Sequence, residues 1–212
     1  MTHLRLPSLL TAAVALTCLS VSPLFAQDQT RKAAQPKQDT SHAHAHDGEV
    51  ELPSLGVAVM LPTKGSKVRG VLQLMQKGSD LHVSGKIRNL TPGEHGFHIH
   101  EFGDLRNMAD GTSAGGHFNP TGAEHGTLEH GHVGDLGNIE ANEQGVATVD
   151  VTLKDTKLHF VLGRTFVVHA DRDDLTSQPS GNAGARVGLG LIGVGNPEFK
   201  AAPKEQKQPK QQ

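Results

Sequence analysis

The chain has 212 residues, of which 35% are hydrophobic and 3% aromatic, with 25 glycines and 11 prolines. This length supports one sizeable hydrophobic core, so we expect a single globular domain with polar tails. The net charge is -2 at pH 7, and because the C-terminal tail is basic, the domain itself is acidic. An acidic domain binds nucleic acid poorly, which argues against a function on nucleic acid.

The N-terminus has the features of a secretory signal. Arg5 precedes a short apolar run, and Ala26 offers a small residue for cleavage. We therefore expect residues 1–26 to be a signal peptide and the protein to be exported, to the periplasm or outside the cell. The apolar run is too short to span a bilayer, so no transmembrane segment is expected in the mature form. Cys18 leaves lipid attachment as the alternative; it is the only cysteine, so no disulfide can form within the chain.

Two polar segments flank the expected domain, residues 50–196. Residues 27–49, which include His42, His44 and His46, are expected to be a disordered linker, and residues 197–212 a disordered polar tail. Runs rich in apolar and β-branched residues, bounded by Gly, Pro, Asn and Asp, lie between them. These predicted strands are 56–61, 68–75, 81–87, 96–102, 146–153, 165–170 and 187–194. None of them has helical periodicity, so the fold class is all-β, an antiparallel sandwich or barrel.

Histidines carry the candidate chemistry. His98 and His100 are two residues apart on a predicted strand, so both imidazoles project from one face, where they can share a metal ion. On this pair alone, two surface histidines on a strand are the favoured interpretation. His169 ends a predicted strand and is followed at once by Asp171, Asp173 and Asp174, which favours a ligand, although a polar residue at the rim of a barrel has the same pattern.

A long glycine-rich loop follows the His98 strand. It holds His117, His125, His132 and Asp135, with little apolar content, and such a loop is unusual in a compact domain unless something orders it. Three histidines and one aspartate form a tetrahedral set that suits Zn²⁺ in a structural role. A solvated, mobile loop remains the alternative on these residues alone.

Five ordered motifs together resemble the copper/zinc superoxide dismutase family over roughly residues 54–195. The motifs are Gly93 to Gly103, Thr112 to Pro120, His132 to Asn138, Gly163 to His169 and Gly181 to Arg186. The resemblance implies an eight-stranded Greek-key β-barrel, an immunoglobulin-like sandwich architecture, with long metal-binding and active-site loops.

The resemblance also implies the role of each site residue. Copper would be held by His98, His100, His117 and His169, and zinc by His117, His125, His132 and Asp135. His117 would then bridge the two metals and deliver a proton, Asp173 would link a copper ligand to a zinc ligand, and Arg186 would attract the anionic substrate.

The implied function is a superoxide dismutase, an antioxidant oxidoreductase that forms dioxygen and hydrogen peroxide from superoxide by alternate reduction and oxidation of copper. The alternative is an extracytoplasmic copper-binding or copper-delivery protein on the same fold. A homodimer is a possible assembly. One departure from the family stands out, because Gly111 and Leu189 occupy the positions of the cysteines that form its usual intrasubunit disulfide.

The remaining histidines have plainer interpretations. His95 is expected to be a hydrogen-bonded structural residue beneath the His98 strand. His82, His130 and His159 are expected at the surface without partners.

Overall fold

The computed structural model describes residues 51–200. The expected signal peptide and linker, residues 1–26 and 27–49, lie outside the described residues, as do residues 201–212 of the expected tail. These boundaries therefore stay predictions. Within residues 51–200, no helix is both long and apolar enough to cross a membrane.

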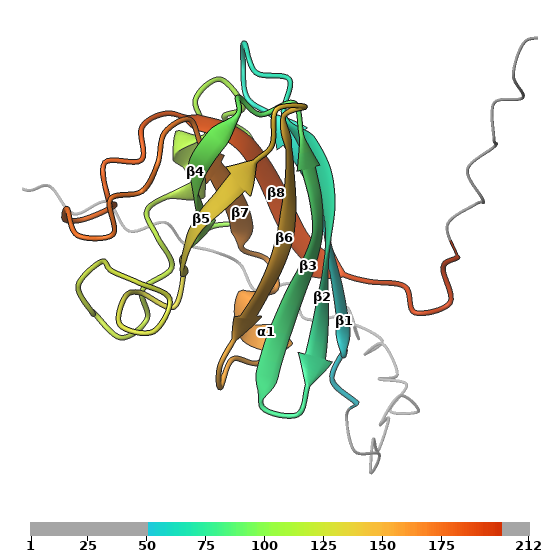
Figure 1. Cartoon of the computed structure of the whole chain (residues 1–212). Coiled ribbons are helices and arrows are strands. Elements are labelled where there is room, and N and C mark those ends of the chain that lie inside the picture. Colours follow the sequence, from blue (N-terminus) through green and yellow to red (C-terminus); the bar gives the residue numbers. More distant parts are fainter. Residues whose placement is uncertain (1–50, 201–212) are drawn as a thin grey trace, which may run out of the picture. The chain divides into compact units, whose positions relative to one another are not determined.

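Antiparallel strands close into an eight-stranded barrel (Figure 1). In chain order they are β1 (Leu55–Pro62), β2 (Arg69–Lys77), β3 (Asp80–Arg88), β4 (Gly93–His100), β5 (Asp135–Ala141), β6 (Val146–Leu153), β7 (Thr165–His169) and β8 (Arg186–Val194). Around the barrel the order is β1-β2-β3-β6-β5-β4-β7-β8, and β8 pairs with β1. Because β3 pairs with β6 and β4 with β7, the connections cross the barrel ends as in a Greek key. The expected all-β barrel is confirmed.

The β2 strand shows how the sequence pattern builds the barrel wall. Leu72 and Leu74 are fully buried, whereas Val71 is 52% and Met75 47% exposed. Because successive side chains of a strand point to opposite faces, the two leucines line the core and the other two face outward. Leu74 pairs with Val83 of β3, which is also fully buried. Neighbouring strands therefore contribute apolar side chains to one core at the same level.

The β4 and β7 strands carry the candidate site. Phe97 of β4 and Phe166 of β7 are fully buried, and their rings stack with centroids 5.2 Å apart. Because Phe97 faces the core, His98 and His100 face the outside of the barrel. Both histidines are nevertheless buried, since loops cover this part of the outer face. The site therefore lies between a rigid wall and its loops.

Two elements differ from the sequence expectations. The seven predicted runs overlap β1–β4 and β6–β8, but no strand was expected at β5, which contains Gly137 and Asn138. β5 forms because its backbone pairs with β4. A single helical turn, α1 (Leu158–Val161), is too short to produce a detectable periodicity. Its first amide is satisfied by the Gln76 side chain, whose Oε1 accepts a hydrogen bond from Leu158 N at 2.7 Å.

Truncation of the core should be far more costly than truncation of the outer face. We expect Leu74→Ala to lower the free energy of unfolding by about 2–5 kcal/mol, because it leaves a cavity between strands. Val71→Ala, on the same strand but facing outward, should change it by less than about 0.5 kcal/mol. Equilibrium urea unfolding of both variants at matched metal content measures the difference. Equal losses would contradict the assignment of the two faces.

Candidate metal centre

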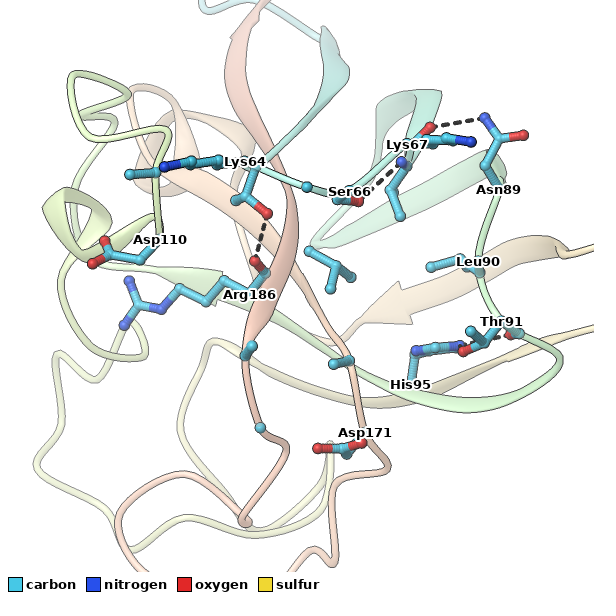
Figure 2. Close-up of a pocket in the computed structure, with 18 of the residues that line it drawn as sticks. Lys64, Ser66, Lys67, Asn89, Leu90, Thr91, His95, Asp110, Asp171 and Arg186 are labelled. Carbon is cyan, nitrogen blue, oxygen red and sulfur yellow. Dashed lines mark hydrogen bonds between the residues drawn. The ribbon is translucent and has the colours of Figure 1, made fainter.

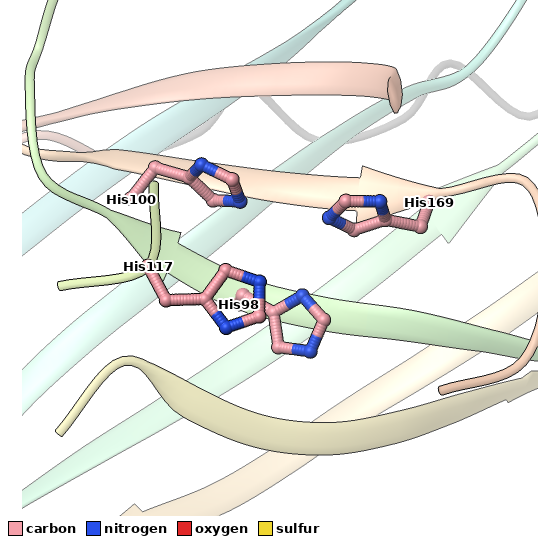
Figure 3. Close-up of side chains that lie close together, drawn as sticks. All are labelled: His98, His100, His117 and His169. Atoms are coloured by element: carbon pink, nitrogen blue, oxygen red, sulfur yellow. The ribbon is translucent and has the colours of Figure 1, made fainter. Parts of the chain in front are cut away.

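Four histidines from separate parts of the chain converge on the outer face of β4 and β7. His98 and His100 come from β4, His169 ends β7, and His117 lies in the loop that follows β4. One ring nitrogen of each lies within 4.8 Å of those of the others, and the rings surround a common space (Figure 3). The four side chains are buried. We refer to them as the first donor group.

Backbone hydrogen bonds hold the loop against β4. Phe118 N donates to Ile99 O at 2.8 Å, and Ile99 N donates to Gly134 O at 2.8 Å. His100 and His117 face each other across an isolated β-bridge. A side chain at Gly134 would collide with the backbone of Ile99 and Phe118, so the close return of the loop requires glycine there. The sequence thus brings His117 to β4 through two main-chain hydrogen bonds made by Ile99.

Each ring of the first donor group has one nitrogen held by the protein and one left free. The held nitrogens contact oxygen atoms at 2.7–3.1 Å: His98 Nε2 with Asp173 Oδ2, His100 Nδ1 with Gly115 O, His117 Nδ1 with Asp135 Oδ1, and His169 Nδ1 with Gly184 O. The free nitrogens find no hydrogen-bond partner among residues 51–200; they are His98 Nδ1 and the Nε2 atoms of His100, His117 and His169. Buried polar atoms normally have partners. Four convergent lone pairs without one therefore fit a metal ion.

Burial keeps these imidazoles ready for a metal. It lowers the pKa of His98 to about 4 and the pKa of His169 to about 3. Burial, with the nearby charge of Arg186, also holds the pKa of His100 well below its ordinary value. Metal ligation needs the neutral ring. The environment of the first donor group therefore favours the ligating form at neutral pH.

A second donor group lies beside the first. It consists of His117, His125, His132 and Asp135, whose donor atoms also lie within 4.8 Å of one another. Asp135 Oδ1 is 2.7 Å from His117 Nδ1 and 3.2 Å from His132 Nδ1, and Asp135 Oδ2 is 2.9 Å from His125 Nδ1. The last contact lacks hydrogen-bond geometry. Ligand atoms of tetrahedral zinc lie roughly 3.3 Å apart, given bonds of about 2.0–2.1 Å. The 3.2 Å separation is close to that value, and the other two are shorter.

Asp135 is held as a carboxylate. Burial alone would raise its pKa, but hydrogen bonds from His117 and from the backbone amides of Gly126 and His132 outweigh burial and hold the pKa below its ordinary value. Because imidazoles ligate a metal as neutral rings, the three histidines and this carboxylate would together offer it one negative charge. That charge suits a divalent cation.

His117 belongs to both donor groups. Its Nε2 is one of the free nitrogens of the first group, whereas its Nδ1 points to Asp135 of the second. Because the two nitrogens lie on opposite edges of one ring, the side chain is placed to contact two cations at once.

Asp173 contacts one histidine of each donor group. Its Oδ2 contacts His98 Nε2 at 2.7 Å, and its Oδ1 contacts His125 Nε2 at 3.0 Å. All three side chains are fully buried. Asn138 Oδ1 accepts a hydrogen bond from Asp173 N at 2.8 Å, which fixes the backbone of the aspartate. Such carboxylates orient ligating imidazoles and set their tautomer.

Arg186 lies at the opening to the first donor group. A cavity of about 580 Å³ is lined by residues that include His100, His117, His169 and Arg186. Among the described residues that line it, Arg186 is the only lysine or arginine. The guanidinium is half-buried, and burial lowers its pKa, but an arginine remains charged at neutral pH. The arrangement places one fixed positive charge next to four imidazoles.

A larger cavity, of about 980 Å³, is also lined by Arg186. Figure 2 shows Lys64 and Asp110 near Arg186 at one side of it, and Lys67 and Asn89 at the other. Within residues 51–200, the two donor groups are the only clusters of His, Cys, Asp and Glu that converge closely enough to hold a metal. The chemistry is therefore at the smaller cavity.

The other histidines lie outside the donor groups. His95 is buried, with Nδ1 2.8 Å from His169 O and Nε2 2.8 Å from Thr91 O, so it supports the end of β7 as a structural residue. His130 and His159 are exposed. His82 differs from expectation, because its Nε2 lies 2.7 Å from Asp150 Oδ1. The pairing of β3 with β6 creates this contact, which residue spacing could not reveal.

The sequence analysis missed two residues that support the ligands. Asn138 is the partner of Asp173 described above. Arg164 lies over the Phe118 ring at 3.5 Å and donates to Glu101 O at 2.7 Å. It therefore contacts the residues that follow His117 and His100. The only signal for Arg164 was its place in the motif before His169.

Comparisons with known proteins point to one family. Residues 68–192 match the family described as copper/zinc superoxide dismutase (SODC). Superoxide dismutase [Cu-Zn] 3 of Arabidopsis thaliana is 48% identical over 149 residues, which cover 65% of this chain and 90% of that protein. The extracellular superoxide dismutase [Cu-Zn] of Haemonchus contortus is 41% identical over 169 residues, which cover 73% of this chain and 91% of that protein.

A solved structure agrees with the sequence matches. The clock protein EA4 superimposes with a TM-score of 0.63 at 37% identity, and the match covers 69% of this chain and 98% of that chain. The residues matched by the family contain both donor groups, Asp173 and Arg186. The chain belongs to the copper/zinc superoxide dismutase family.

Proposed function

We propose that the protein converts superoxide to dioxygen and hydrogen peroxide, with copper in the first donor group and zinc in the second. The observation that carries the proposal is His117, whose ring nitrogens face both groups while Arg186 stands at the opening. Relatives at 41–48% identity are named superoxide dismutases. The metal roles follow from the donor sets.

The two donor sets differ in the way the two metals require. Four imidazoles, of which those of His100, His117 and His169 line a cavity, suit a redox metal with a free coordination position. Three imidazoles with the buried carboxylate of Asp135 suit structural zinc. When bound, copper supplies one-electron redox chemistry between Cu²⁺ and Cu⁺, and zinc supplies a fixed charge without redox chemistry.

The residues of the chain must supply protons to the reaction. Two superoxide anions and two protons yield one dioxygen and one hydrogen peroxide. His117 Nε2 faces the substrate side, so it is the atom that takes up a proton and returns it to the product, a general-acid role. Its Nδ1 stays turned to Asp135, which keeps the ring in place through the cycle.

Arg186 attracts the substrate. The domain as a whole is acidic and repels an anion at long range. A positive charge beside the opening, in a cavity with no carboxylate among its described lining residues, reverses that local field. Local focusing of this kind is a known device of this enzyme family. Arg186 therefore serves capture and placement of superoxide rather than metal binding.

Asp173 serves both metal sites through their ligands. It holds His98 and His125 by their outer nitrogens, so movement of either ring disturbs the other. We assign it the role of coupling the geometry of the two donor groups.

A copper-binding or copper-delivery protein is the second candidate. It would use the first donor group but needs neither the shared His117 nor Arg186. The presence of both favours the enzyme, and dismutase activity separates the candidates.

Export and assembly complete the proposal. Relatives from Haemonchus contortus and Brugia pahangi are named extracellular, which supports a secreted or periplasmic protein together with the signal expected in residues 1–26.

For assembly we infer a homodimer through the outer face of β8. Leu191 is 42% and Phe102 50% exposed, and Leu191 lies beside Gly103, the residue that follows Phe102. Grouped exposed apolar side chains mark protein contacts.

The shared histidine should be indispensable. We expect His117→Ala, loaded with both metals, to lose at least about 100-fold of the dismutation rate, because it removes a ligand of each group and the proton donor. A superoxide-decay assay with metal analysis of the same samples measures this. His159→Ala, which changes an exposed histidine, is the control. Full activity in His117→Ala would contradict the proposal, and tight copper binding without activity in the unaltered protein would favour the delivery protein.

Loss of the charge at Arg186 should reduce capture. We expect Arg186→Ala to lower kcat/KM about tenfold or more and to weaken its decline with ionic strength, while copper and zinc contents stay unchanged. Arg172→Ala removes the same charge from an exposed pair with Glu94 and is the matched control. Pulse radiolysis at several salt concentrations gives both quantities. The same rate and salt dependence in Arg186→Ala and Arg172→Ala would show that net charge alone matters.

The dimer should depend on the β8 face. We expect Leu191→Glu to convert the protein to monomers, because a charge at the centre of an apolar contact is costly to bury. Thr148→Glu, an exposed change on β6 across the barrel, should leave the dimer intact. Sedimentation equilibrium measures the mass of each. A monomeric unaltered protein would contradict the inference.

A further inference from the structure

The position of Arg186 is set by a loop rather than by the barrel. Its guanidinium donates to Gly111 O at 2.6 Å through one terminal nitrogen and to Gly115 O at 2.7 Å through the other. Both acceptors lie in the segment between β4 and β5. A long arginine side chain has many rotamers, so these two bonds decide where the charge stands. Whatever holds this segment also holds the charge.

A small apolar cluster outside the main core holds the segment. Leu189 points outward from β8 yet is fully buried. We refer to the group as the Leu189 cluster; its members are Leu105, Met108, Ala114, Val167 and Leu189. Three of them belong to the loop and two to the barrel wall. The cluster is therefore the apolar contact by which this part of the loop adheres to β7 and β8.

Leu189 also touches the residue that carries one of the acceptors. A Cβ atom at Gly111 would lie 2.9 and 3.1 Å from the two methyl carbons of Leu189, and 3.2 Å from Arg186 Cδ. The Gly111 backbone, at φ +74°, is thus enclosed between the leucine and the stem of the arginine. Its carbonyl cannot shift without opening that contact.

The attachment is not covalent. The only cysteine of the chain is Cys18, so no disulfide ties the loop to β8. Backbone bonds near Gly111 are mostly internal to the loop, such as Gly111 N to Asn107 O at 2.9 Å. One backbone hydrogen bond joins the cluster to the segment that follows β1: Lys64 N donates to Met108 O at 2.9 Å. Packing of Leu189 is therefore the main restraint on the Gly111 side of the loop.

Gly115 is restrained differently. Its carbonyl also contacts His100 Nδ1 at 2.9 Å, and the neighbouring Phe102 N donates to Ala114 O at 3.0 Å. These bonds fix that end of the segment to β4. Truncation of Leu189 should therefore release Gly111 O and leave the contact to His100 in place.

We propose that Leu189 is a positioning residue for the substrate-attracting charge: its packing on Gly111 fixes the carbonyl that orients the Arg186 guanidinium. The inference rests on the proposed dismutase function. Leu189 belongs to neither donor group and does not line the smaller cavity, so the proposed effect runs through Arg186.

A double-mutant comparison tests this dependence. We expect Leu189→Ala in the metal-loaded enzyme to lower kcat/KM about threefold or more, and the same change in an Arg186→Ala background to alter it by less than about twofold. Leu189→Met, which conserves volume, should restore the rate. Leu189→Val gives a graded truncation where alanine prevents folding. Equal losses with and without Arg186 would overturn the proposal, because they would show a general structural effect.

A measurement of loop motion separates this inference from the function. Hydrogen exchange of the metal-loaded protein, followed by mass spectrometry, should show exchange in residues 104–114 about tenfold faster in Leu189→Ala. Leu74→Ala truncates a buried leucine of the main core and should leave both this exchange and the rate per bound copper within about twofold. Unchanged exchange in Leu189→Ala would overturn the proposal. An unaltered protein without dismutase activity would instead refute the function, while the exchange result would still decide the role of Leu189 in the loop.

Discussion

The whole site depends on the orientation of one imidazole ring. His117 must present Nε2 to the first donor group and Nδ1 to Asp135, and a planar ring fixes the second direction once the first is set. The protein fixes it from three directions: by the bridge to His100, by the Phe118 backbone bond to Ile99, and by the buried carboxylate. A small rotation of this ring would disturb both donor groups.

In this arrangement, buried ring nitrogens have no hydrogen-bond partner among the described residues and can be satisfied by a metal ion. Buried nitrogens without partners are unfavourable in an apolar surrounding. Because the ligands come from β4, β7 and the loop between β4 and β5, satisfying them joins segments distant in the sequence. Metal affinity and loop order are therefore two aspects of one free energy. The barrel wall, with the stacked Phe97 and Phe166 behind it, supplies the rigid side.

The sequence predicted the parts of this structure that follow a local period. Alternation in β2 and the spacing of His98 and His100 are properties of a single strand, so both were accessible. β5 was not, because its pairing with β4 overrides the poor strand propensity of Gly137 and Asn138.

The sequence could not show which nitrogen of each ring is free. That choice depends on distant backbone atoms, for instance Gly115 O for His100 and Gly184 O for His169. The support from Asn138 to Asp173 spans 35 residues and leaves no spacing signal. The motifs thus indicated the donor sets through family resemblance, whereas the supporting contacts became visible only in three dimensions.

The loop after β4 is held in two different ways along its length, and the difference matches its two tasks. Its later part, from His117 to Asp135, carries ligands and converges on polar atoms that a cation completes. Its earlier part carries no ligand and adheres through the Leu189 cluster, an apolar contact that needs no cation. The Arg186 charge is bonded to this earlier part. The proposed attraction of substrate thus depends in part on a contact that needs no metal, and the two tasks meet at Gly115 O, which accepts from Arg186 and also contacts His100 Nδ1.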